Sequence, residues 1–277
     1  MLKRVDRVQI VVRDRSEARG VAAAIFGAEL IRQDQVKPLC ARRSVLQAGS
    51  SIIEFLEPDG AGPIADFAAR WNTGLYAVGF SVADVEAAAA HFDRAGVKYA
   101  RDCGQLFLDA SATGGMQTVI SAFHERSPVG AIKWIFEVTN VVSEWRATAA
   151  RYARIFALDP ARNVPIEVDH FGYTGTLMMF DAPNRLDRIE LSQPTREAAM
   201  GRFHQRHGDS LYMFYCETDT VEAIAERLQA RGGRFTPRNE GVHDGLWIHP
   251  TAFCGVLVGL SRTNVAWRWS GDSERGR

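Results

Sequence analysis

The feature of this sequence that most constrains its fold is an internal repeat. Residues 53–99 align without a gap on residues 189–235, at an offset of 136. Within them, IEFLEP from Ile53 matches IELSQP from Ile189, and the apolar pattern agrees almost throughout. Self-similarity at a fixed offset is the signature of a duplicated structural unit. The sequence therefore predicts two halves of similar fold.

The repeat also sets the expected boundaries. From Leu108 onward the offset becomes 140, and the match extends to the end of the second half. We expect a first pair of modules over residues 1–125 and a second pair over residues 130–265. The last residues, 266–277, are polar and charged, and we expect them to form a flexible tail.

Each half divides again into two similar units. Val5–Val12 alternates like a strand with one buried face, and an Ala-rich helical stretch follows over Ser16–Phe26. The strand-then-helix pattern restarts at Leu75, at Ile132 and at Leu211, each time followed by further strand-like runs. The pattern is β-α-β-β-β four times over, which predicts an α+β protein and not a doubly wound parallel sheet.

Charge and hydropathy exclude several classes of partner. Lys and Arg together number 33, and Asp and Glu together also number 33, so the formal net charge is zero. That balance argues against nucleic acid or a membrane held by bulk positive charge. The N-terminus has no apolar h-region, so we expect a cytoplasmic protein whose partner is a small-molecule substrate or ligand. We expect Trp267 and Trp269 to dock on the body of the protein or on a partner subunit, and the second alternative would give a homodimer.

The fourfold module pattern resembles the vicinal oxygen chelate superfamily. This superfamily includes glyoxalase I, methylmalonyl-CoA epimerase, extradiol dioxygenases and bleomycin-resistance proteins. The segments that carry the resemblance most specifically are 52–88 and 247–262, and both look most like the epimerase branch. The resemblance implies that paired modules form cupped mixed sheets around a divalent metal and an oxygenated substrate.

The family's metal ligands are degenerate in this chain. The four positions that the resemblance implies, His, Glu, His and Glu, fall on Arg7, Glu54, Ala77 and Val119 in the first half. In the second half, strand alternation places Lys133, Glu190, Met213 and Gly259 there, with Glu137 competing with Lys133. Ala, Val, Met and Gly offer no ligand to a hard or borderline divalent cation. We therefore expect no metal site and no cofactor.

Both halves place a cation where the first ligand would be and keep the second Glu. Arg7 would then pair with Glu54, and Lys133 with Glu190. A buried carboxylate is costly without such a partner. Two interpretations stay open: a salt bridge that closes a vestigial site, or a charged anchor for a substrate carboxylate, phosphate or enolate.

The second half offers the richer chemistry. Alternation directs Tyr215 and Glu217 toward its cup, and His170 precedes a predicted cup strand. The same argument puts Tyr76 and Tyr212 on the opposite, helix-covered side. We expect catalytic roles for Lys133, Glu190 and Glu137, and substrate contacts from His170, Tyr215, Glu217, Arg7 and Glu54.

Three functions are compatible with these residues. The first is metal-independent proton transfer next to the carbonyl of a small anionic molecule, as in an isomerase, epimerase or lyase. Glu190 or Glu137 would then be the base, and Lys133 would stabilise the developing oxyanion. The second is a non-catalytic binder of the bleomycin-resistance type. The third is a metal-dependent extradiol-type dioxygenase. The sequence does not decide between a catalyst and a binder.

Overall fold

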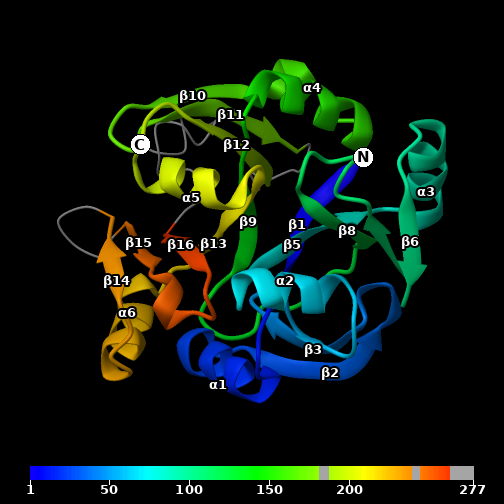
Figure 1. The fold of residues 1–277 in the computed structure, drawn as a ribbon. Coiled ribbons are helices and arrows are strands. Elements are labelled where there is room, and N and C mark those ends of the chain that lie inside the picture. Colours follow the sequence, from blue (N-terminus) through cyan, green and yellow to red (C-terminus); the bar gives the residue numbers. More distant parts are fainter. Residues whose placement is uncertain (181–186, 239–243, 263–277) are drawn as a thin grey trace.

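The computed structural model describes residues 1–180, 187–238 and 244–262. These residues form two eight-stranded mixed sheets with helices packed between and beside them (Figure 1). The first sheet contains β1 (Leu2–Val11), β2 (Glu29–Val36), β3 (Ala41–Ala48), β4 (Ser51–Pro58), β5 (Gly74–Val82), β6 (Tyr99–Asp102), β7 (Gln105–Leu108) and β8 (Gln117–Ala122). Its strand order is β2-β3-β4-β1-β5-β8-β7-β6. The predicted tail, 266–277, lies outside the described residues.

The second sheet repeats the first. It contains β9 (Trp134–Val141), β10 (Val164–Val168), β11 (Tyr173–Met179), β12 (Arg188–Pro194), β13 (Ser210–Glu217), β14 (Phe235–Pro237), β15 (Gly245–Ile248) and β16 (Leu257–Ser261). Its strand order, β10-β11-β12-β9-β13-β16-β15-β14, corresponds strand for strand to that of the first sheet. The predicted α+β fold of four βαβββ modules in two cupped mixed sheets is confirmed.

Each module opens with one strand and one helix, and two further helices lie between the modules of a pair. The module helices are α1 (Arg15–Phe26), α3 (Val85–Arg94), α4 (Trp145–Phe156) and α6 (Val221–Ala230), and the additional ones are α2 (Pro63–Trp71) and α5 (Ala199–His207). Helix α1 begins at Asp14, whose carboxylate accepts hydrogen bonds from the backbone N–H groups of Ser16 and Glu17. No helix within the described ranges is long and apolar enough to cross a membrane.

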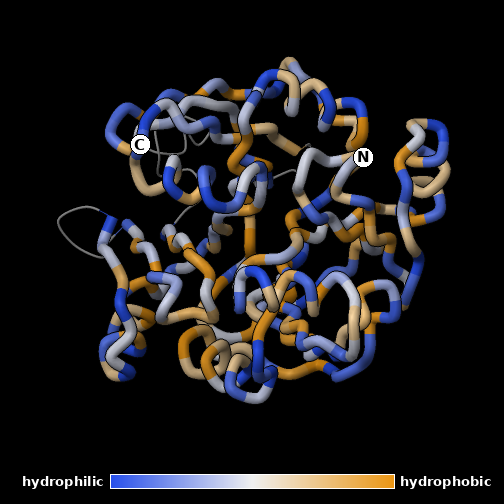
Figure 2. The backbone as a smooth tube through the Cα atoms, viewed as in Figure 1, coloured by the Kyte–Doolittle hydropathy of each residue, from blue (hydrophilic) through white to orange (hydrophobic). Residues whose placement is uncertain are grey.

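The two halves share one hydrophobic core. Its rings come from both halves, as in the contacts of Phe26 with Phe253 at 5.1 Å and of Phe80 with Phe156 at 5.5 Å between ring centroids. Figure 2 shows hydrophobic residues along the interior strands and hydrophilic ones on the outer helices and loops. Because the helix-covered face of each sheet is used for this core, the opposite face is left to form a cup.

A β-bulge interrupts the first strand of each half. On β1, Val5 pairs with Phe80 but Arg7 pairs with Gly79, so Asp6 is the extra residue. On β9, Phe136 is the extra residue between the pairs that Ile135 and Glu137 make with β13. A bulge shifts the side-chain alternation by one residue.

The neighbouring strands carry a second bulge at equivalent places. The extra residue is Tyr76 on β5 and Tyr212 on β13. Both rings consequently pack with the cup-side apolar clusters and not with the shared core. The expectation that Tyr76 and Tyr212 face the helix side is wrong, because it assumed unbroken alternation.

Candidate functional site

Strand register defines the floor of the second cup. On β9, Glu137 pairs with Arg188 of β12, and Thr139 pairs with Glu190. The first half has the same arrangement, because Gln9 pairs with Glu54 and Arg7 sits two residues before Gln9. The residue that corresponds to Arg7 is therefore Glu137, the competing choice, and not Lys133.

Lys133 lies outside the cup. Its Nζ is 2.8 Å from Oδ2 of Asp219 and 3.5 Å from Oε1 of Glu217, and its carbonyl accepts a hydrogen bond from the Ser50 N–H of the other half. The expected pairing of Lys133 with Glu190 is wrong, because the bulge at Phe136 reverses the alternation between them. Burial lowers the pKa of Lys133, but Asp219 and Glu217 outweigh it and raise that pKa overall. The ammonium group therefore stays charged.

Arg188 supplies the cation of the second cup. Its Nε donates a hydrogen bond to Oε2 of Glu137, and its guanidinium lies 5.0 Å from the centroid of the Phe136 ring. Both Arg188 and Glu137 are almost completely buried. Sequence reasoning missed Arg188, although it stands two residues before Glu190 in RIELSQP and therefore has the same strand parity.

Glu190 is a buried carboxyl group with an unusual titration. It accepts hydrogen bonds from Ser192 Oγ at 2.6 Å and from Thr139 Oγ1 at 3.3 Å. Burial, and next the charge of Glu137, raise the pKa of Glu190 to about 8, although Ser192 and Arg188 act in the opposite direction. A carboxyl group that titrates near neutral pH can both give and take a proton.

A cavity of about 460 Å³ opens over Glu190. Most of its wall is aromatic or apolar, with rings from Phe171, Tyr173, Tyr212, Tyr215 and Trp247. Apolar walls with a few convergent polar groups are typical of small-molecule sites. Burial raises the pKa values of Tyr173 and Tyr215 well above the usual value, so both hydroxyls are neutral donors at physiological pH.

Tyr215 fills the place of the family's fourth metal ligand. Its hydroxyl accepts a hydrogen bond from Nε1 of Trp247 at 2.7 Å. A Cβ atom at Gly259 would lie 2.0 Å from atoms of the Tyr215 ring. Glycine at position 259 therefore allows the ring to lie across the cup.

Of the two remaining candidates of the second half, one lines the cavity and the other lies outside it. His170 lies at the rim of the cavity and makes an edge contact with Phe171, whose ring contacts Trp247 in turn. Glu217 is buried at the end of β13 beside Lys133, outside the cavity. The structure thus brings Glu190, Tyr215 and His170 to one cavity and places Glu137 next to it, against Arg188.

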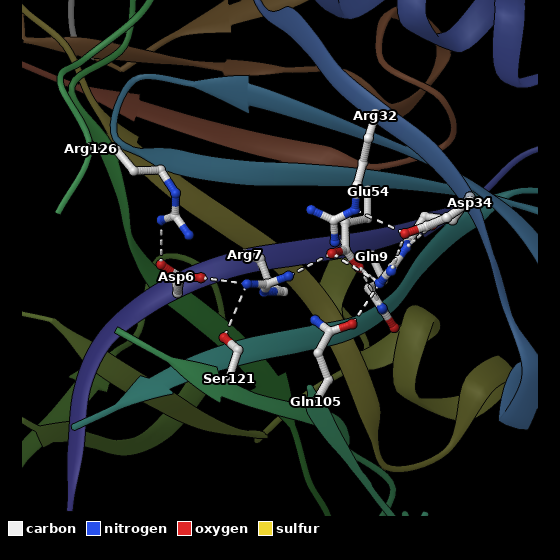
Figure 3. A network of polar contacts seen from close by, with 10 residues as sticks. Asp6, Arg7, Gln9, Arg32, Asp34, Glu54, Gln105, Ser121 and Arg126 are labelled. Atoms are coloured by element: carbon white, nitrogen blue, oxygen red, sulfur yellow. Dashed lines mark hydrogen bonds and ion pairs between the residues drawn. The ribbon is translucent and has the colours of Figure 1, made fainter. Parts of the chain in front are cut away.

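Glu54, on the floor of the first cup, is enclosed by a network of ion pairs (Figure 3). Arg7 contacts Oε1 of Glu54 at 2.6 Å and Oδ2 of Asp6 at 2.9 Å, and Gln9 Nε2 donates to Oε2 of Glu54 at 2.7 Å. Burial raises the pKa of Glu54, but Arg7 and Arg43 outweigh it and lower that pKa overall. Glu54 is therefore held ionised, which is the opposite of Glu190.

Arg43 is the second arginine that contacts Glu54. Its guanidinium is completely buried and contacts Asp34 at 2.8 Å, Gln105 at 2.6 Å and Glu54 at 3.3 Å. Each carboxylate of the network contacts at least one guanidinium. This closed arrangement favours the structural interpretation of the Arg7–Glu54 pair, in which it seals a vestigial site.

The residues present do not fit the divalent metal that such a fold typically holds. In the second cup, Glu137 is engaged by Arg188, Met213 occupies the third position, and the Tyr215 ring covers the fourth at Gly259. In the first cup, a guanidinium occupies the first position, and Ala77 and Val119 offer no donor atom. Among the described residues, no group of three or more His, Cys, Asp or Glu side chains is arranged to hold a metal ion.

Comparison with known proteins agrees with the fold. The family model of the glyoxalase/bleomycin resistance protein/dioxygenase superfamily matches residues 6–106 and 138–251. Because these ranges cover most of the chain, the protein belongs to that superfamily. No curated protein matches the sequence.

Two solved structures illustrate the similarity. A mutant of 4-hydroxymandelate synthase from Streptomyces coelicolor aligns over 99% of this chain and 100% of its own, with a TM-score of 0.71 and 14% identity. A variant of Streptomyces coelicolor methylmalonyl-CoA epimerase aligns with 44% of this chain and 100% of its own, with a TM-score of 0.40 and 24% identity. At 14% identity, the likeness to the first of these structures concerns the fold alone.

Proposed function

We propose that the second cup is an acid–base site for a small carbonyl-containing molecule. The observation that carries this proposal is Glu190: a buried carboxyl group beside a second carboxylate, with its pKa raised to about 8 and a cavity open above it. Buried carboxyls with strongly raised pKa values are typical of proton-transfer sites. The reaction class is isomerisation, epimerisation or lyase-type elimination.

The neighbouring side chains suit this chemistry. Above its pKa, Glu190 accepts a proton from the carbon next to the carbonyl. The neutral hydroxyls of Tyr173 and Tyr215 are hydrogen-bond donors at the same cavity, and such donors stabilise an oxygen that gains negative charge. Glu137 is engaged by Arg188 and does not line the cavity, so Glu190 is the carboxyl group that faces the ligand.

Proton exchange at carbon tests the proposal directly. Wild-type protein is incubated in D₂O with a panel of keto acids and acyl-CoA thioesters, and NMR follows the loss of the C–H signal next to each carbonyl. We expect exchange with at least one compound, and at least a hundredfold slower exchange with Glu190→Gln. Lys133→Met, which changes a charged residue outside the cup, should exchange like the wild type. Equal exchange by Glu190→Gln would contradict the proposal.

A second candidate function is binding without catalysis. The observation in its favour is the aromatic rim, where Phe171 is 41% exposed and contacts Trp247. Such a rim suits the capture of a planar ligand. The same experiment separates the two functions, because a binder would show ligand-induced chemical shifts and a raised melting temperature with no deuterium incorporation.

A further inference from the structure

A second cavity, of about 750 Å³, lies between the two halves. Helices α2 and α5, cyan and yellow near the centre of Figure 1, contribute to its walls. The two helices occupy equivalent places in the repeat, so each side chain of α2 has a counterpart in α5 at an offset of 136. The pseudo-symmetry of the chain therefore brings like residues together across this inter-half cleft.

Stacked rings form one wall of the inter-half cleft. Trp71 at the end of α2 stacks on its counterpart His207 at 4.0 Å between ring centroids. On the other side, His207 stacks on Phe203 at 4.1 Å. The guanidinium of Arg70 lies 4.5 Å from the centroid of the Trp71 ring. The three rings thus form one stack, with a guanidinium over the Trp71 ring.

The charge of the inter-half cleft is positive and not neutralised. Arg70 and its counterpart Arg206 both line it, together with His207 and His249, and no acidic side chain of the described residues does. Within the described ranges, neither arginine forms an ion pair. Burial, and next the charges of Arg206 and Arg70, lower the pKa of His207, so the positive charge of the cleft comes from the two guanidinium groups. Guanidinium groups that lie close together without a carboxylate partner are suited to binding an anion.

The inter-half cleft adjoins the cavity over Glu190. Ala199, Tyr212 and Leu257 line both cavities. Tyr212 is the bulged residue of β13, so the irregularity that turns this ring toward the cup also places it at the boundary. The two cavities therefore meet along these three side chains.

We propose that the inter-half cleft binds the anionic group, a phosphate or a carboxylate, of an extended ligand whose other end lies over Glu190. Arg70 and Arg206 contact the anion, and the Trp71–His207–Phe203 stack supports the adjoining apolar part. The anion site follows from the cleft alone, and only the position of the ligand's second end rests on the proposed function. Arginine suits both anions because its planar group donates two parallel hydrogen bonds.

Calorimetric titration with small aromatic anions tests the anion site. Phenyl phosphate and benzoate represent the two sources of negative charge, and benzyl alcohol is the neutral probe. We expect the wild type to bind at least one anion, with affinity that falls as salt is added, and to bind it at least tenfold more tightly than Arg70→Gln/Arg206→Gln. The preferred anion identifies the group that the cleft accepts.

The control variant also loses two arginine charges, but at positions outside both cavities. Arg94 and Arg231 are exposed and line neither cavity, so Arg94→Gln/Arg231→Gln should bind like the wild type. Absence of anion binding by the wild type, or equal weakening in both double variants, would overturn the proposal. Unchanged binding by Arg70→Gln/Arg206→Gln would overturn it as well.

The outcome can be separated from that of the proposed function. Glu190→Gln should keep the anion affinity of the wild type, because Glu190 does not line the inter-half cleft. For any compound that exchanges its proton, Arg70→Gln/Arg206→Gln should raise KM and leave kcat within about twofold. Anion binding without proton exchange would support the anion site and contradict the acid–base proposal.

Discussion

At the scale of single residues, the pKa values of two equivalent glutamates, one in each cup, are shifted in opposite directions. Glu54 contacts Arg7 and Arg43 and is held ionised, whereas Glu190 lies beside Glu137 and holds its proton to about pH 8. The same position of the repeated fold thus holds an ionised glutamate in a salt bridge in the first half and a protonated glutamate in the second. The difference arises from the neighbours, since Arg7 corresponds to Glu137 in the second half.

The raised pKa of Glu190 makes stability depend on pH. In the unfolded chain this carboxyl has its ordinary pKa of 4.5, and in the folded protein about 8. Between these values the folded state holds a proton that the unfolded state has released, so stability falls as pH rises and levels off above about pH 8. The loss amounts to a few kcal/mol, at roughly 1.4 kcal/mol per pKa unit.

Glu190→Gln should remove this dependence. We expect the variant and the wild type to be similarly stable near pH 4.5, and the variant to be the more stable near pH 9, by a few kcal/mol. Urea unfolding of both proteins at the two pH values measures the difference. A wild type that gains stability relative to Glu190→Gln as pH rises would show that the pKa of Glu190 is lowered.

Gly259 is expected to be required for the position of Tyr215. An alanine Cβ would lie 2.0 Å from the ring, so Gly259→Ala should displace Tyr215, break its hydrogen bond with Trp247 and cost about 1–3 kcal/mol of stability. Gly20→Ala is the matched control, because no atom lies within 4 Å of a Cβ at that position in α1. Thermal unfolding measures both, and equal stabilities of the two variants would contradict the expectation.

At the scale of elements, regular patterns were predictable and irregular ones were not. The strand and helix that open each module were visible because apolar alternation and a helical stretch of residues are local signals. Strand β2 was not placed, because most of its residues are exposed and polar, so that no buried face marks it. The bulges at Phe136 and Tyr212 follow from pairing with a neighbouring strand, which one strand's sequence does not reveal.

The helix caps give a test at this scale. The carboxylate of Asp14 accepts hydrogen bonds from the N–H groups of Ser16 and Glu17 at 2.7 and 3.1 Å, so Asp14→Ala should cost about 1 kcal/mol. Glu144 stands at the corresponding position of α4 and makes no capping hydrogen bond, so Glu144→Ala should be close to neutral. Chemical denaturation compares the two variants, and an Asp14→Ala protein as stable as Glu144→Ala would contradict the capping role.

At the scale of the whole molecule, one duplicated fold serves two purposes. The halves share a core through contacts such as Phe80 with Phe156, so each depends on the other for burial of its helices. In the first cup, ion pairs enclose Glu54, and the cavity of about 410 Å³ beside it is lined by Gln9, Ala77 and Val119 and not by Glu54. In the second cup, the cavity opens directly over a titratable carboxyl group. The first half therefore stabilises the second and supplies Arg70 and Trp71 to the cleft between them.

This division predicts that the first cup can be altered without loss of ligand binding. Arg7→Met removes one partner of the completely buried Glu54 and of Asp6, and breaking a buried pair in this way costs about 3–5 kcal/mol. Arg7→Met/Glu54→Leu removes both charges and should recover part of that loss, although it leaves Asp6 with Arg126 alone. Unfolding curves measure the stabilities.

Both variants should keep the function of the wild type. At a temperature where both are folded, each should exchange substrate protons and bind phenyl phosphate like the wild type. The reason is that neither Arg7 nor Glu54 lines the cavity over Glu190 or the inter-half cleft. A folded Arg7→Met protein that had lost either property would place part of the working site in the first cup.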